Sequence, residues 1–125
     1  MSKYPKISDA EWKVMQVVWK KHPCTSSEII EALKEDTTWN PKTIHTLIDR
    51  LVKKEALTAV KDSSFYEYTP KFTEEQLSQE ETKSFVKKIY NGSINLLIAN
   101  FLKEEKLTSE EIKELKDILD NKKSE

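Results

Sequence analysis

Residues 39–70 read WNPKTIHTLIDRLVKKEALTAVKDSSFYEYTP, and this stretch gives the clearest indication of how the chain folds. Asn40 followed by Pro41 is a typical helix start, because asparagine caps free backbone amides and proline is tolerated in the first turn. Four apolar residues then recur at the spacing of a single helical face, namely Ile44, Leu47, Ile48 and Leu51. We therefore expect a helix that packs through one narrow apolar stripe.

The opposite side of this helix is polar and mostly basic. Placing successive residues about 100° apart around the axis brings together Lys42, His45, Thr46, Asp49, Arg50 and Lys53. Arg50 is the only arginine among the 21 basic residues of the chain. A helix with this division has one surface that packs and one that is displayed.

The end of the stretch changes character. Residues 57–70 are rich in Thr, Val, Phe and Tyr, which favour strands, and Asp62-Ser63-Ser64 in the middle is typical of a turn. The sequence therefore predicts a β-hairpin of two short strands directly after the helix.

Two capping boxes precede the stretch. Ser8 with Glu11 and Thr25 with Glu28 each place a hydroxyl three residues before a carboxylate, which predicts two further helix starts. The first seventy residues thus read helix, helix, helix, hairpin, the arrangement of a winged helix-turn-helix DNA-binding domain. The expected fold class is mainly α with a small β-hairpin wing, and residues 1–70 form the DNA-binding domain.

Residues 71–125 are predicted to be a helical dimerisation region. Capping boxes begin helices after Thr73 and Thr108. The first half of the helix after Thr73 has few apolar residues and is expected to be a solvent-exposed spacer. Residues 121–125 are expected to fray as a polar tail. The helix over 93–102 is apolar on two sides, and about fifty residues are too few to cover it. A homodimer would cover it, through the apolar residues Ile94, Leu97, Ile98, Phe101, Leu102, Ile112, Leu115 and Leu119.

Composition narrows the possible functions. The chain has 125 residues, a net charge of −1, one Gly and one Cys. Nucleic acid must therefore be bound by a local patch rather than a bulk field, and no glycine-rich phosphate loop, nucleophile motif or zinc-ligand spacing is present. We expect no enzyme activity, no metal and no small-molecule cofactor.

The N-terminus lacks a signal peptide and no apolar run is long enough for a membrane helix, so a cytoplasmic location is expected.

Candidate DNA-binding residues lie on the displayed helix face and in the wing. A lysine in the first turn adds to the anion preference of a helix N-terminus, threonines suit phosphate or thymine contacts, and arginine can grip a guanine edge or a phosphate with two hydrogen bonds. The candidates for double-stranded operator DNA are Lys42, Thr43, His45, Thr46 and Arg50, with Lys61 and Ser63 from the wing, which has few basic residues.

The segments ISDAEWKVMQVVW, WNPKTIHTLIDRLVKKEAL, YEYTP, TKSFVKKIYNGSINLLIANF and SEEIKELKDIL resemble the BlaI/MecI penicillinase-repressor family. The resemblance implies a dimeric winged-helix repressor of β-lactam resistance genes that binds an inverted-repeat operator. It also implies inactivation by cleavage in the dimerisation region, triggered by a membrane β-lactam sensor with a zinc-protease domain. The bond cleaved in such relatives is Asn–Phe, which matches Asn100-Phe101 here.

One residue departs from the family pattern: His45 occupies a position where arginine is expected, which reduces the positive charge of the displayed face. The cysteine-rich tail of copper-responsive relatives is absent, which disfavours metal sensing. Two alternatives stay open: a winged-helix module that binds another protein, and an orphan repressor that answers a different signal. Salt separates DNA binding from a protein interface, because phosphate contacts weaken steeply as salt rises.

Overall fold

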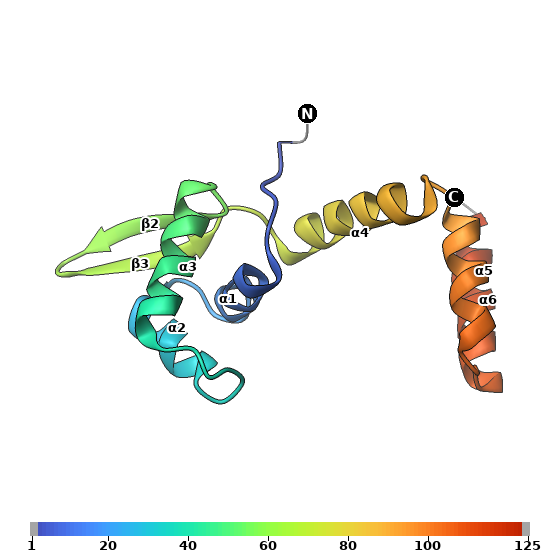
Figure 1. The fold of residues 1–125 in the computed structure, drawn as a ribbon, viewed down its shortest axis with the longest axis horizontal. Coiled ribbons are helices and arrows are strands. Elements are labelled where there is room, and N and C mark those ends of the chain that lie inside the picture. Colours follow the sequence, from blue (N-terminus) through green and yellow to red (C-terminus); the bar gives the residue numbers. More distant parts are fainter. Residues whose placement is uncertain (1–2, 124–125) are drawn as a thin grey trace. The chain divides into compact units, whose positions relative to one another are not determined.

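The computed structural model describes residues 3–123 and divides the chain into two compact units, Met1–Glu81 and Thr82–Glu125. In chain order the elements are α1 (Asp9–Lys20), β1 (Cys24–Thr25), α2 (Ser26–Leu33), α3 (Pro41–Lys53), β2 (Leu57–Asp62), β3 (Phe65–Pro70), α4 (Glu74–Tyr90), α5 (Ile94–Glu104) and α6 (Ser109–Lys123) (Figure 1). The predicted order of three helices followed by a hairpin, in a mainly α chain, is confirmed.

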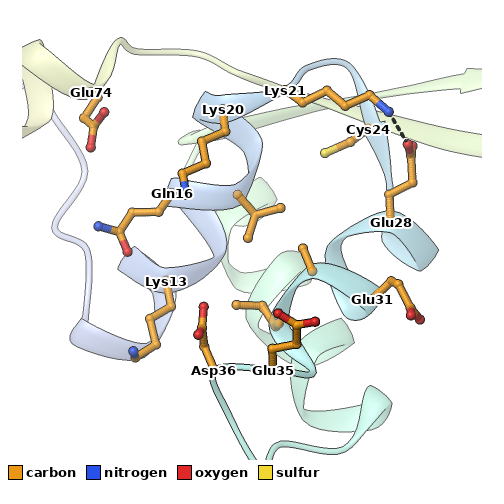
Figure 2. Close-up of a pocket in the computed structure, with 13 residues that line it drawn as sticks. Lys13, Gln16, Lys20, Lys21, Cys24, Glu28, Glu31, Glu35, Asp36 and Glu74 are labelled. Atoms are coloured by element: carbon orange, nitrogen blue, oxygen red, sulfur yellow. Dashed lines mark hydrogen bonds and ion pairs between the residues drawn. The ribbon is translucent and has the colours of Figure 1, made fainter.

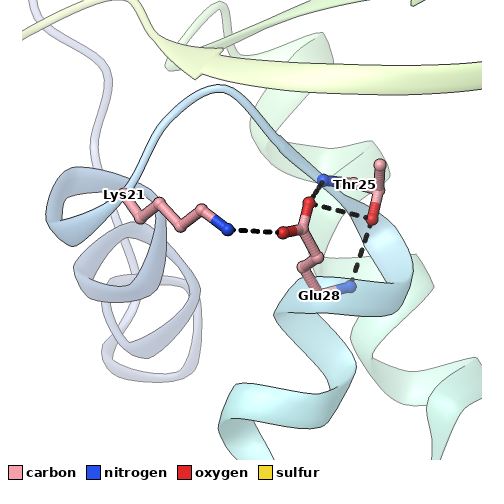
Figure 3. Close-up of polar contacts among 3 residues, drawn as sticks. All are labelled: Lys21, Thr25 and Glu28. Carbon is pink, nitrogen blue, oxygen red and sulfur yellow. Dashed lines mark hydrogen bonds and ion pairs between the residues drawn. The ribbon is translucent and has the colours of Figure 1, made fainter.

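Side chains cap the helices where the sequence predicts. The Ser8 amide donates to Glu11 Oε1 at 2.8 Å, and the Glu11 amide donates to Ser8 Oγ at 3.2 Å. Thr25 and Glu28 form the same reciprocal pair at the start of α2, as Figure 3 shows. At α3 the Asn40 side chain accepts the Thr43 amide at 2.9 Å. These bonds satisfy backbone donors that a helix start leaves without intrahelical partners.

The sheet has three antiparallel strands in the order β1-β3-β2. β2 and β3 pair from Leu57 opposite Pro70 to Asp62 opposite Phe65, and Ser63 takes the left-handed conformation in the turn between them. β1 adds a short third strand to β3, with Cys24 opposite Tyr68. The sequence did not reveal β1, because two residues are too few to show a strand periodicity.

The core of the first unit is the meeting point of three helices and the start of β2. It contains the complete apolar stripe of α3, apolar residues of α1 and α2, and Ala56 and Leu57. Leu77 of α4 is also buried there, so the prediction of a solvent-exposed spacer is wrong for the start of this helix. The compact unit continues to Glu81, whereas the functional boundary at residue 70 stays a prediction.

The second unit consists of the end of α4 together with α5 and α6. α4 ends where Asn91 and Gly92 adopt positive φ angles of 53° and 89°, a conformation that glycine takes at little cost. Neither α5 nor α6 contains a buried residue. Residues 121–123 belong to α6, which corrects the prediction of a frayed tail, while residues 124–125 lie outside the described part of the chain.

Candidate nucleic-acid interface

The helix α3 divides sharply into a buried and an exposed side. Its four apolar stripe residues are buried, and Ile44, Ile48 and Leu51 are within 1% of complete burial. All five α3 residues predicted to bind DNA are exposed, namely Lys42, Thr43, His45, Thr46 and Arg50. The structure therefore brings the predicted helix residues together on the surface of one element, beside the hairpin (Figure 1).

The start of α3 suits a negatively charged partner. Lys42 lies in the first turn, where the helix dipole already favours anions. Thr46 donates its hydroxyl proton to the Lys42 carbonyl at 3.0 Å. The Thr46 side chain can therefore offer a methyl group and an oxygen acceptor to a neighbour, but its proton is already committed.

Asp49 is the acidic exception on the exposed side of α3. Burial raises the pKa of the Tyr68 phenol above its ordinary value, and the nearby negative charge of Asp49 raises it further. The carboxylate of Asp49 thus lies close enough to β3 to act on a wing tyrosine.

The wing carries the two further predicted residues and an apolar feature that the sequence analysis missed. Lys61 and Ser63 are exposed, and Lys61 Nζ lies 5.9 Å from the ring centroid of Tyr66, its cross-strand partner. Val60 and Tyr66 are also exposed, and Phe65 is 64% exposed. The sequence shows aromatic residues next to the serine turn, but it does not show whether the strand that carries them is covered.

A cavity of about 720 Å³ lies between α1 and α2 (Figure 2). Its walls carry Lys13 and Lys20 from α1 and Glu31 and Glu35 from α2 or its end, so the two helices present opposite charges. This groove contributes nothing to the exposed side of α3, and it is lined by none of the residues predicted to bind DNA.

Cys24, which also lines the groove, lies in surroundings that disfavour its thiolate form. Burial is the main reason that its pKa rises to about 11, with Glu28 raising it further and Lys21 opposing the rise. At neutral pH the thiol is protonated and a poor nucleophile. Within residues 3–123 no three side chains of the metal-binding types gather into a site.

The residues predicted for dimerisation all lie on α5 and α6. Leu97 is half-buried and the other seven are exposed, namely Ile94, Ile98, Phe101, Leu102, Ile112, Leu115 and Leu119. The predicted cleavage bond Asn100-Phe101 lies inside α5, in regular helix. Across the described residues, no helix is both long and apolar enough to span a membrane.

Comparison with known proteins gives one consistent family. The model of the family described as penicillinase repressor matches residues 7–121. The penicillinase repressor of Bacillus licheniformis is 42% identical over 99% of this chain and 97% of its own length. The methicillin resistance regulatory protein MecI of Mammaliicoccus sciuri is 40% identical over 93% of this chain and 94% of its own length.

A solved structure supports the same assignment for the first unit. The solution structure of the DNA-binding domain of the repressor BlaI aligns with a TM-score of 0.53 and 46% identity, over 59% of this chain and 90% of that domain. The solution structure of monomeric Bacillus licheniformis BlaI in complex with the blaP half-operator gives the same values. The chain therefore belongs to the penicillinase repressor family, a family of DNA-binding transcriptional repressors and not of enzymes.

Proposed function

We propose that this protein is a homodimeric repressor that binds an inverted-repeat operator and controls β-lactam resistance genes. The observation that carries the proposal is the division of α3, whose apolar stripe is buried while every candidate DNA-binding residue on it is exposed. The printed descriptions of the relatives support it, since they name penicillinase and methicillin-resistance regulators and a complex of BlaI with half-operator DNA.

The proposed DNA contacts follow from the chemistry of the exposed side chains. An α-helix fits the major groove, where Arg50 can take two acceptors of a guanine and Thr43 or Thr46 can contact a thymine methyl. Lys42 at the helix start would bind phosphate, and Lys61 and Ser63 of the wing would contact the backbone. His45 makes this face less positive than an arginine would. Because the net charge is only −1, affinity depends on this local set.

The homodimer is supported by the apolar surface of α5 and α6. Seven large apolar side chains of these two helices that we assign to the interface are at least 40% exposed in the single chain. Soluble monomers rarely expose contiguous apolar patches of more than a few hundred Å². Two-fold pairing of this region would cover the surface and present two α3 helices to two half-sites.

Cleavage at Asn100-Phe101 is the proposed route of induction. The bond lies within the region assigned to dimerisation, so cutting it would remove the rest of α5 and all of α6 from the interface. A membrane β-lactam sensor protease pathway would supply the signal. Loss of the dimer would then lower operator affinity, because two linked half-site contacts become two independent ones.

The test is a binding titration with DNA from upstream of this chain's own gene, repeated at several salt concentrations. We expect two protomers per site, a clear preference over a scrambled duplex of equal length, and an affinity that falls steeply with salt. Binding that ignores sequence, or an affinity indifferent to salt, would contradict the proposal and favour the protein-interaction module. Induction of the bound gene by a compound other than a β-lactam would favour the orphan repressor.

A further inference from the structure

Glu11 and Lys54 join the first helix to the end of α3. Lys54 Nζ lies 2.6 Å from Glu11 Oε1 and also donates to the Lys6 carbonyl at 2.9 Å. Glu11 is only 1% exposed and is the one buried charged or polar residue in the described part of the chain, whereas the Lys54 side chain is 38% exposed. A lysine on the rim thus reaches inward to a carboxylate in the core.

Glu11 is oriented by contacts that do not involve the lysine. Its carboxylate accepts the Ser8 amide at 2.8 Å, and its own amide donates to Ser8 Oγ at 3.2 Å, so the capping box of α1 sets its orientation. The same carboxylate oxygen, Oε1, accepts both the Ser8 amide and the Lys54 ammonium. The carboxylate of the pair is therefore held in a fixed position by α1.

Lys54 connects the ion pair to α3, the helix that displays Arg50. As the C-cap residue of α3, it donates its backbone amide to the Arg50 carbonyl at 2.9 Å. The chain then turns through Glu55, with φ at 64°, and the Ala56 amide donates to the Leu51 carbonyl at 2.9 Å. The last turn of α3 is thus held by its backbone bonds and by one ion pair whose carboxylate is buried.

The ammonium of Lys54 is held by the protein itself in this arrangement. Two acceptors, the Glu11 carboxylate and the Lys6 carbonyl, take two of its three N–H donors on the side of the N-terminal segment. Breaking the pair by removing one partner leaves an uncompensated charge, so the last turn of α3 must shift or open to solvent. Such a shift moves Arg50, because the Arg50 carbonyl accepts the Lys54 amide in that turn. Precise base contacts depend on supporting residues that hold the contacting side chain in position.

We propose that Glu11 and Lys54 form a positioning pair that sets the register of α3 on DNA without touching the DNA. This inference rests on the proposed function, since it assigns a specificity role within operator binding. Loss of the pair weakens discrimination between operator and other sequences, while the phosphate contacts that give general DNA affinity are kept.

The experiment compares the Glu11→Gln and Lys54→Met variants with the double variant Glu11→Gln/Lys54→Met, which leaves no unpaired charge. Lys54→Arg is the conservative variant that keeps the ion pair. Lys71→Met is the matched control, because Lys71 forms an exposed ion pair with Glu55 at 3.2 Å. The double variant also keeps the test decisive if a single variant folds poorly.

The first readout is hydrogen exchange in the free protein, which needs no DNA. We expect the amides of Lys54 and Ala56 to exchange about tenfold faster in both single variants and in the double variant. Lys54→Arg and Lys71→Met are expected to keep the parent rates. Equal rates in all variants would overturn the role of the pair in holding the last turn.

The second readout is the ratio of affinities for the upstream duplex and a scrambled duplex at several salt concentrations. We expect this ratio to fall about tenfold in the folded variants, the size of losing one base contact, with an unchanged salt dependence. An unchanged ratio, or a salt slope that falls by about one charge in Lys54→Met alone, would overturn the proposal, the latter because Lys54 would then bind phosphate. A parent protein that shows no preference defeats the proposed function instead, while hydrogen exchange still decides whether the pair holds α3.

Discussion

The side-chain amide of Asn100 donates a hydrogen bond to the phenol oxygen of Tyr90, 3.1 Å away. Tyr90 is the last residue of α4 and Asn100 lies in α5, so the bond joins two helices of the second unit. Asn100 is also the first residue of the bond that we propose is cleaved. A protease must pull this segment out of the helix, and the hydrogen bond opposes that step.

The variant Tyr90→Phe is expected to loosen α5 around Asn100. A neutral hydrogen bond of this kind contributes about 0.5–1.5 kcal/mol, so local opening should become about two- to twelvefold more frequent. Hydrogen exchange at the amides of residues 100–105 measures it, with Tyr66→Phe in the wing as the control. An unchanged exchange rate in α5 would show that the bond does not restrain the helix.

The variant Ile98→Asp is expected to be monomeric. A charge placed in the proposed apolar interface cannot be buried without a partner, and the cost exceeds what a modest interface supplies. Sedimentation equilibrium gives the mass directly. The control is Asn95→Asp, which adds the same charge at an exposed polar position of the same helix. A dimer that survives Ile98→Asp places the interface elsewhere.

The variant Arg50→Ala is expected to lose about 1–3 kcal/mol of operator binding if the guanidinium reads a base. Discrimination at one base pair should relax as well, because alanine cannot form the two parallel hydrogen bonds that the guanidinium donates to a base. Titration against single-base operator variants measures both effects. Lys20→Ala removes a positive charge from α1 instead, and its binding should stay within about twofold of the parent. Equal losses in both variants would mean that Arg50 acts only through its charge.

The free energy of unfolding of the first unit is expected to depend on pH through Glu11. Burial alone raises the pKa of this carboxyl, but hydrogen bonds from Lys54 and Ser8 and the Lys54 charge outweigh that effect, so the pKa lies below 4.5. A lowered pKa contributes stability that is complete above the unfolded value and is lost as the pH falls through the folded value. Chemical unfolding should therefore show a loss in the parent below about pH 4.5 that is smaller in Glu11→Gln. Identical pH profiles would exclude this contribution.

Cys24 is expected to resist thiol reagents in the folded protein. Its pKa of about 11 lies two units above the ordinary value of 9.0, so the thiolate fraction near neutral pH falls about 100-fold. The rate of reaction with a disulfide reagent should rise by at least that factor when the chain is unfolded in denaturant. A fast reaction in the native state would show that the thiol is reactive in the folded protein.

Periodicity and capping residues predicted nearly all of the first unit. The stripe of α3, the serine turn of the wing and the capping boxes depend on contacts within a few residues, so the sequence displays them directly. The signals that failed depend on distant partners. β1 exists only because β3 lies beside it, and Leu77 is buried only because the core of the preceding helices reaches it.

The candidate site was predicted as residue types on a face, and the structure adds how that face is held. Nothing in the spacing of Glu11 and Lys54 indicates that they meet, because their contact spans 43 positions in the chain. The exposed aromatic residues of the wing were equally hidden, since a strand-forming pattern does not tell a covered strand from an uncovered one.

The short strand β1 has a mechanical consequence. Thr25 pairs with Glu67 in β3, and its hydroxyl also accepts the Glu28 amide that begins α2. Thr25 therefore links the pairing of the wing strand β3 to the start of α2, and a displacement of β3 away from β1 would act on the residue that caps that helix. In the complex that we propose, a wing tied to α2 in this way would leave the bending to the duplex, and the bendability of the site would become part of what is recognised.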